Sequence, residues 1–132
     1  MTLVFLGGVL SEQIPCVRDV ANSLAAEPFS LELVRTGFWK RPRILWCGPE
    51  RTPEPLQQLV HELQIGLTRC GFEPEKRTYK PHVTLARKAS ATPTQLLHEP
   101  IIWQPREFVL AGSHSGPKPP RYRILDRWDF RT

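Results

Sequence analysis

Residues 80–87 read Lys80-Pro81-His82-Val83-Thr84-Leu85-Ala86-Arg87, and the interpretation of the whole chain starts from them. The β-branched and apolar residues after the proline predict a strand over residues 79–86. Because side chains alternate along a strand, His82 and Thr84 share one face, whereas Val83 and Leu85 point into the core. The same alternation puts Arg87 on the opposite face, so that it reaches His82 only where the strand bends or ends.

The side chains of this strand suit phosphate chemistry. An imidazole exchanges a proton near neutral pH, a hydroxyl donates a hydrogen bond, and a guanidinium binds phosphate oxygens. His82 and Thr84 therefore predict a site that holds a phosphate group and moves a proton to or from it. The alternative is that both are inert side chains on an exposed strand face, which is the more frequent outcome for such a pair.

A second copy of the motif lies at the start of the chain. Met1-Thr2-Leu3 aligns with Val83-Thr84-Leu85, and in both places a Thr-Leu pair sits in an apolar run. The position that matches His82 would be the residue before Met1. The repeat predicts a domain built from two related halves, with the first half lacking its histidine in these 132 residues.

The rest of the chain predicts alternating strands and helices. Apolar runs and alternation indicate strands at residues 2–6, at 29–34 and 43–47 (a hairpin across 37–42), and at 108–110 and 122–128. Helical spacing of apolar residues indicates helices at 12–26, with Ser11 as a possible cap, and at 56–70, ended by Gly71. We expect a polar connection with one helical turn over residues 89–104 and a mobile loop over 112–120. This mixed order predicts an α+β fold with largely antiparallel sheet.

Length and composition exclude several classes of protein. A chain of 132 residues is predicted to form one domain, residues 1–132. It has no apolar run long enough to span a membrane and no recognisable signal peptide, so we expect no membrane association and a cytoplasmic location. No spacing of metal ligands and no phosphate-binding glycine loop occurs, so no metal or cofactor is expected. Three widely spaced cysteines, Cys16, Cys47 and Cys70, predict buried free thiols.

The positive charge is concentrated in the second half. Residues 1–75 carry seven Lys/Arg and nine Asp/Glu, whereas residues 76–132 carry eleven and four. A one-sided positive field favours partners that carry phosphate, and a solvated basic face is the alternative. The presence of the His82 motif in the basic half favours the phosphate partner. Phe38 and Trp39, between two predicted strands near the presumed cleft, could stack on a nucleobase, or pack in the core or at its rim.

Taken together, the His82-Val83-Thr84-Leu85 motif, its partial repeat at Thr2-Leu3 and the Pro42-Arg43-Ile44-Leu45-Trp46 segment resemble the 2H phosphoesterase superfamily. The resemblance is to its RNA 2′,3′-cyclic phosphodiesterase branch, also called the 2′-5′ RNA ligases. It implies two pseudo-symmetric lobes of mainly antiparallel sheet with helices outside, and two His-x-Thr motifs that act without a metal. It also implies that this chain is incomplete at its N-terminus and lacks the first strand.

The resemblance implies a function and its residues. RNA ends with a 2′,3′-cyclic phosphate would be hydrolysed to 2′-phosphomonoesters, with reversible 2′-5′ ligation as a side activity. His82, Thr84 and Thr2 would be catalytic, and Arg87, Phe38 and Trp39 would contact the substrate. Because the first-motif histidine is absent, the alternative is an impaired module that binds a nucleotide or an RNA end. We expect a monomer, or a dimer paired through an exposed strand edge.

Overall fold

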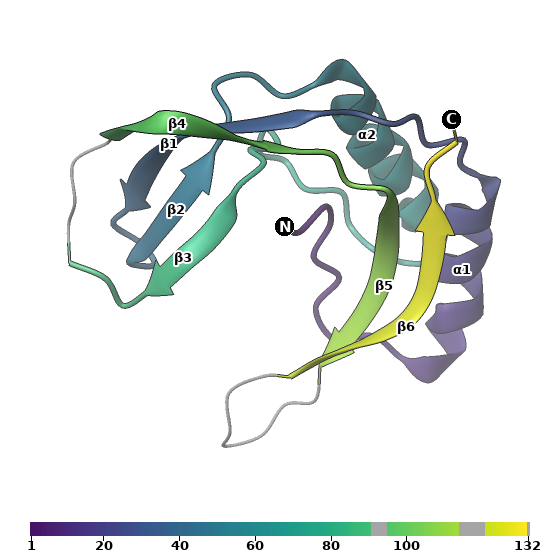
Figure 1. Cartoon of the computed structure of the whole chain (residues 1–132). Helices are drawn as coiled ribbons and strands as arrows, with labels where there is room; N and C mark the ends of the chain where they lie inside the picture. Colours follow the sequence, from purple (N-terminus) through teal and green to yellow (C-terminus); the bar gives the residue numbers. More distant parts are fainter. Residues whose placement is uncertain (91–94, 114–120, 132) are drawn as a thin grey trace.

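The computed structural model of this chain describes residues 1–90, 95–113 and 121–131, and it is an α+β fold with antiparallel sheets (Figure 1). After a short 3₁₀ turn at Ser11–Gln13, the elements run in the order α1 (Ile14–Ser23), β1 (Leu31–Trp39), β2 (Ile44–Gly48), α2 (Glu54–Thr68), β3 (Val83–Arg87), β4 (Gln95–Trp103), β5 (Glu107–Ser113) and β6 (Tyr122–Asp129). The α+β prediction with antiparallel sheet is confirmed. The loop predicted to be mobile lies mostly outside the described residues.

Two separate sheets carry the fold. Strands β3, β2, β1 and β4 form one sheet in that order, and β5 pairs with β6 in the other. In Figure 1 the four-stranded sheet lies at the left, while α1 and α2 lie beside the two-stranded sheet at the right. The N-terminal segment runs between the two sheets.

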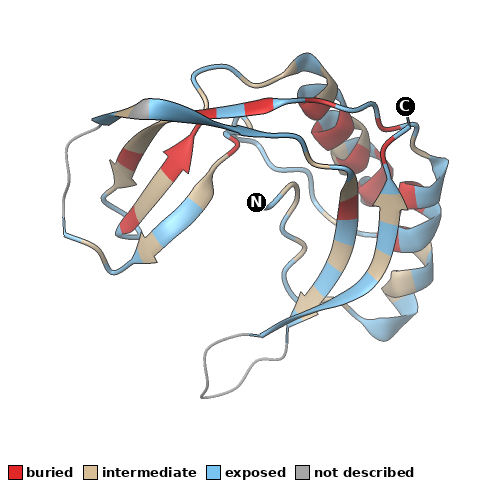
Figure 2. Ribbon diagram, viewed as in Figure 1, coloured by how far each residue is buried: buried red, intermediate tan, exposed pale blue. Residues whose placement is uncertain are grey.

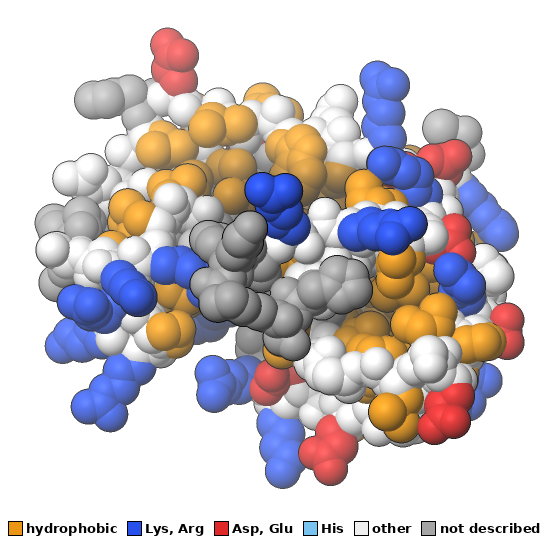
Figure 3. Space-filling view, turned by 90° about the horizontal axis from the view of Figure 1, so that it is seen from below, with side chains coloured by type: hydrophobic (Ala, Val, Ile, Leu, Met, Phe, Trp, Pro, Cys, Tyr) orange, Lys and Arg blue, Asp and Glu red, His pale blue; other side chains and the backbone are white. Residues whose placement is uncertain are grey.

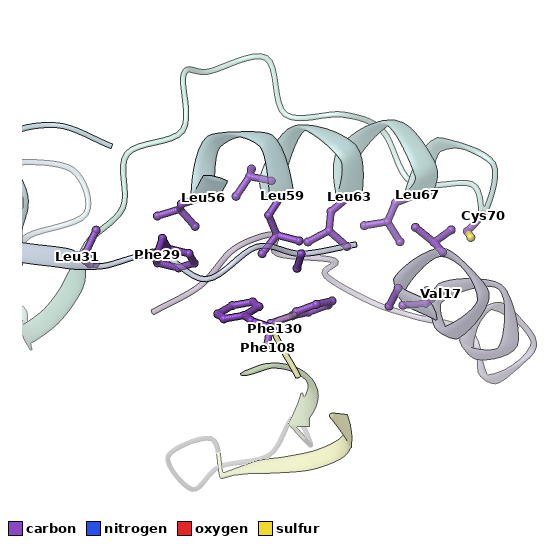
Figure 4. Packing of buried hydrophobic residues seen from close by; sticks show 14 of the residues in the cluster. Val17, Phe29, Leu31, Leu56, Leu59, Leu63, Leu67, Cys70, Phe108 and Phe130 are labelled. Atoms are coloured by element: carbon purple, nitrogen blue, oxygen red, sulfur yellow. The ribbon is translucent and has the colours of Figure 1, made fainter. Parts of the chain in front are cut away.

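The core joins the helices to both sheets. The buried stripe of α2 packs against α1, β1 and the aromatic residues of the two-stranded sheet (Figures 2 and 4); its members are Leu56, Leu59, Val60, Leu63 and Leu67. Phe130 lies between Phe29 and Phe108, with ring centroids 5.4 Å and 6.1 Å away. Gly71 follows α2 and has a φ of +93°, a left-handed conformation that favours glycine. It ends the second helical segment as predicted.

The prediction that all cysteines are free thiols is wrong for two of them. Cys16 in α1 and Cys70, just after α2, form a disulfide. Both cysteines lie in apolar stretches of the sequence, but a local pattern could not show that the two stretches meet. Cys47 is a buried free thiol as predicted, and burial raises the pKa of its thiol.

The predicted strand at residues 2–6 is also wrong. The segment is irregular: Leu3, Val4 and Leu6 pack partly against the core, and Phe5 is 85% exposed. A strand needs a neighbour to complete its backbone hydrogen bonds, and no described strand pairs with this segment.

The connection predicted over residues 89–104 contains a strand instead of a helical turn. β4 pairs with the outer edge of β1, with Leu31 opposite Trp103 and Arg35 opposite Leu96. Pro100 falls within the irregular part of this pairing, between the partners of Leu33 and Arg35. An edge strand tolerates a proline at such a bulge, which is why proline was a misleading signal for a loop.

The other elements differ from prediction mainly at their ends. The β1–β2 hairpin is confirmed, but β1 continues to Trp39, so the turn is shorter than predicted. The first helix ends at Ser23, earlier than predicted. At its start the side chain of Gln13, not Ser11, satisfies the backbone: Leu10 N–H donates to Gln13 Oε1 at 2.9 Å.

Candidate functional site

His82 sits immediately before β3, the edge strand of the four-stranded sheet. Its Nδ1 lies 2.8 Å from the carbonyl oxygen of Lys80. A carbonyl only accepts hydrogen bonds, so Nδ1 carries the hydrogen and the neutral ring has its lone pair on Nε2. The ring meets the indole of Trp39 edge-on, with centroids 4.6 Å apart and planes at 76°. These two contacts fix both the tautomer and the orientation of the imidazole.

Arg87 lies on the same face of the sheet as Thr84, although regular alternation would separate them. Thr84 pairs with Trp46 and Arg87 pairs with Ile44 on β2. Ile44 and Trp46 are two residues apart and share a face, and directly paired residues share a face. Leu85 is the extra residue of a β-bulge, which shifts the alternation by one position.

The bulge also corrects the prediction for Leu85. Its side chain is 54% exposed and does not point into the core, whereas Val83 packs against the core as predicted. An edge strand can accommodate such a bulge because only one side of its backbone is paired.

We call this surface the His82 face and define it by Trp39, Trp46, His82, Thr84 and Arg87. Trp39 belongs to it because it pairs with Ile44. Its ring lies 5.4 Å from that of Trp46, at an interplanar angle of 36°. The face thus combines an oriented imidazole, an exposed hydroxyl, an exposed guanidinium and two indoles.

Trp46 is the member that sequence reasoning missed. Its indole covers Gly37 on β1, where an added Cβ would lie 2.2 Å from the ring. The guanidinium carbon of Arg35 lies 6.0 Å from the Trp46 ring centroid. A glycine inside a strand signals a close approach of this kind, and Gly37 in the correct register with Trp46 would have revealed it.

Two buried N–H groups at the His82 face have unsatisfied hydrogen-bonding capacity. Among the described residues, the buried Nε of Arg35 and Nε1 of Trp46 have no hydrogen-bond partner. Both groups are N–H donors, and Arg35 is a permanent cation. They add to the positive potential of a surface that already carries Arg87.

The other predicted site residues lie elsewhere. Phe38 adjoins Trp39 in β1 and pairs with Leu45, so it lies on the opposite face of the sheet. Thr2 lies in the irregular N-terminal segment, where its carbonyl oxygen accepts a hydrogen bond from the Tyr79 hydroxyl at 3.0 Å. Burial raises the pKa of Tyr79 to about 12, so this hydroxyl stays protonated and serves as a donor.

A large cavity of the described part of the chain lies away from the His82 face. It has a volume of about 1200 Å³ and lies between the N-terminal segment, α1 and the two-stranded sheet. Thr2 lines it, whereas His82, Thr84 and Arg87 do not. The side chains of the His82 face therefore lie outside this cavity.

His61 lies exposed on α2 and does not belong to the His82 face. His114 lies outside the described residues, as does the side chain of His98. In the described part of the chain, no group of three or more His, Cys, Asp or Glu residues could hold a metal ion. Nor is any helix there long and apolar enough to cross a membrane.

Known proteins match nearly the whole chain. RNA 2′,3′-cyclic phosphodiesterase from Escherichia coli is 33% identical over 130 residues, which are 97% of this chain and 73% of that protein. A crystal structure of a phosphoesterase superposes with a TM-score of 0.91 at 31% identity, over 99% of this chain and 76% of the other. The structure of E. coli LigT complexed with 3′-AMP gives a TM-score of 0.90 at 31% identity, with the same coverage. The profile of the 2′-5′ RNA ligase superfamily matches residues 2–113, and the chain belongs to this family.

Proposed function

We propose that this protein hydrolyses RNA ends that carry a 2′,3′-cyclic phosphate and forms 2′-phosphomonoesters. The observation that carries the proposal is the His82 face, where an imidazole oriented through Nδ1 by the Lys80 carbonyl shares one surface with Thr84 and Arg87. The names of the relatives support it, since the matched proteins from E. coli and Thermus thermophilus are both RNA 2′,3′-cyclic phosphodiesterases.

The reaction needs two proton transfers. Water attacks phosphorus and gives up a proton, the bond from phosphorus to the 3′ oxygen breaks, and that oxygen takes a proton as it leaves. His82 supplies one transfer through Nε2, as general base or as general acid. No second histidine of the described residues belongs to the His82 face, so in this proposal the other transfer falls to water.

Thr84 and Arg87 stabilise the charge on phosphorus. In this proposal the Thr84 hydroxyl donates to a nonbridging oxygen, and the Arg87 guanidinium offsets the negative charge that grows in the transition state. Thr84 and Arg87 can together stabilise the negative charge of the transition state. The 2′-5′ ligation is the same chemistry with the 5′ hydroxyl of a second RNA in place of water.

Trp39 has a different role in this proposal from base stacking alone. Its edge contact with His82 makes it a positioning residue, and its exposed surface remains able to stack on the terminal base. Phe38, on the other face of β1, takes no part.

Turnover of a 2′,3′-cyclic mononucleotide tests the proposal. We expect a 2′-monophosphate as the product and a loss of about 10²–10⁴-fold in kcat for His82→Ala. His61→Ala is the matched control, because this exposed helix histidine should leave kcat unchanged. A wild-type protein that binds the nucleotide without turnover would instead indicate a binding module. Turnover that survives His82→Ala would refute the assignment of His82.

A further inference from the structure

Five cations lie together at the end of the four-stranded sheet, and one of them, Arg87, also belongs to the His82 face. Lys40, Arg41 and Arg43 belong to the β1–β2 turn, and Arg87 and Lys88 end β3. We call this group the basic tip. All five residues are exposed, and the two segments adjoin, because Ala89 N–H donates to the carbonyl oxygen of Arg43 at 3.3 Å. Figure 3 shows Lys and Arg side chains gathered on the left, over this end of the sheet.

No acidic residue of the surrounding sequence balances this charge. Residues 33–49 and 76–98 contain nine Lys and Arg and no Asp or Glu. The ion pairs of the described residues lie elsewhere, between Arg18 and Asp126 and between Arg127 and Glu107. The basic tip therefore presents an uncompensated positive field to solvent, which favours a polyanionic partner.

The basic tip is continuous with the His82 face. Ile44 pairs with both Trp39 and Arg87, and Trp39 contacts His82. At about 3.3 Å per residue, and with one step lost at the Leu85 bulge, the chain from His82 to Lys88 spans roughly 16 Å. A single nucleotide bound at His82 cannot reach along this whole path, whereas an oligonucleotide can.

We propose that the basic tip binds the phosphodiester backbone of the RNA strand that leads to the cyclic end, so that the preferred substrate is an oligonucleotide. This inference rests on the proposed function, since a 2′,3′-cyclic phosphate closes the 3′ end and the remaining chain extends from it on the 5′ side only. Cations beside the indoles of Trp39 and Trp46 match a single strand, whose backbone meets charge while its bases meet aromatic rings.

Removal of charge from the turn tests the inference. Lys40→Gln, Arg41→Gln and Arg43→Gln are combined in one variant, which leaves Arg87 intact. Its control combines Arg51→Gln, Arg69→Gln and Arg131→Gln, three exposed arginines away from the tip, so that both variants lose the same charge. The probe is a fluorescent ten-nucleotide RNA with a 2′-phosphate end, which the enzyme cannot hydrolyse further. Anisotropy is measured from 50 to 200 mM salt.

The tip variant should bind the RNA about 30-fold more weakly at low salt, and its log–log salt slope should be shallower by about 2, as expected for three lost contacts to a single strand. The control variant should stay within about twofold of wild type. Equal weakening in both variants, or no weakening in the tip variant, would overturn the inference. So would tip-dependent binding to phosphatidylserine vesicles with unchanged RNA binding, since a membrane would then be the partner.

Turnover of a cyclic mononucleotide separates this inference from the proposed function. Tip-dependent RNA binding in a protein that turns over neither the mononucleotide nor a cyclic-ended ten-nucleotide RNA would support the RNA-binding tip and refute the hydrolase. Equal kcat/KM for the mononucleotide and for a cyclic-ended ten-nucleotide RNA would leave the hydrolase standing and refute the role of the tip.

Discussion

The two Thr-Leu pairs of this chain have the same sequence and different structures. Thr84-Leu85 lies in β3, paired with β2 in the four-stranded sheet, where a bulge brings Arg87 to the face of Thr84. Thr2-Leu3 lies in an irregular segment beside the two-stranded sheet, and the Thr2 carbonyl accepts a hydrogen bond from the Tyr79 hydroxyl. A local motif therefore becomes a strand only where a neighbouring strand completes its backbone hydrogen bonds.

The halves that carry these pairs are also stabilised differently. The half with His82 is stabilised by the backbone hydrogen bonds of a four-stranded sheet. The other half consists of a two-stranded sheet and two helical segments that the Cys16–Cys70 disulfide joins. The first three of the following comparisons act on one half and keep the other as reference, and the last removes a hydrogen bond between the halves.

Reduction of the disulfide should have the largest effect on stability. Cys16 and Cys70 are 54 residues apart, and loss of a cross-link that closes such a loop costs about 3–4 kcal/mol. This corresponds to a fall of roughly 10 °C in Tm for a chain of this size. Thermal unfolding with and without dithiothreitol measures it, and a Cys16→Ser, Cys70→Ser double variant should not respond to the reductant. Amide exchange that accelerates first in β1–β3, and not in α1 and β5–β6, would contradict the account.

Thr84→Val and Thr2→Val compare the two motif copies directly. Loss of a hydrogen bond to a charged phosphate costs about 1.5–3 kcal/mol, so Thr84→Val should lower kcat/KM by about 10–100-fold. Thr2→Val should lower it by less than about threefold, since its segment forms no strand. Steady-state hydrolysis of a cyclic mononucleotide checks both. Equal losses would show that the N-terminal copy takes part in catalysis, as the resemblance to two-motif enzymes implies.

Gly37→Ala should displace Trp46, a member of the His82 face. The added methyl group would lie 2.2 Å from the Trp46 ring, so the indole must move, at about 1–3 kcal/mol of unfolding free energy. Gly8→Ala is the matched control in the other region, because a Cβ added there would meet nothing within 4 Å. Denaturant unfolding followed by tryptophan fluorescence measures both variants. An unchanged stability and emission spectrum for Gly37→Ala would refute the packing of Trp46 on β1.

Tyr79→Phe should have the smallest effect, about 1 kcal/mol at neutral pH, from the lost hydrogen bond to Thr2. The pH dependence of the folding stability is a more specific test of this residue. Because the pKa of Tyr79 is about 12 in the folded protein and near 10 when exposed, the folded state holds the proton more tightly between these values. Stability of the wild type should therefore be intact below pH 10 and fall towards pH 12, by up to about 1.4 kcal/mol per pH unit. The Tyr79→Phe variant should lack this contribution, and identical slopes in both proteins would contradict it.

Much of the fold follows from local patterns. The stripe of α2, the stop at Gly71 and the β1–β2 hairpin were predictable because apolar periodicity and turn residues act over a few positions. The strand at residues 2–6, the strand β4 and the disulfide depend on which segments meet in space. The periodicity of apolar residues does not show which distant segments contact each other.

In the candidate site too, some features follow from local sequence patterns and others depend on how the strands pair. His82 and Thr84 could be identified from the motif, and their shared face from alternation. The position of Arg87 depends on a one-residue bulge opposite Leu45 and Trp46, and the contact of Trp39 with His82 depends on register. Register is a property of paired strands, so neither feature was visible in a single strand read alone.

Nitrogen NMR of the imidazole of His82, during titration with a nucleoside 2′-monophosphate, tests the central claim most directly. The account predicts a neutral ring protonated at Nδ1, held by the Lys80 carbonyl, whose Nε2 signal shifts as the nucleotide binds while the signals of His61 stay unchanged. A neutral ring protonated at Nε2, or a His82 ring that does not respond at saturating nucleotide, would contradict it.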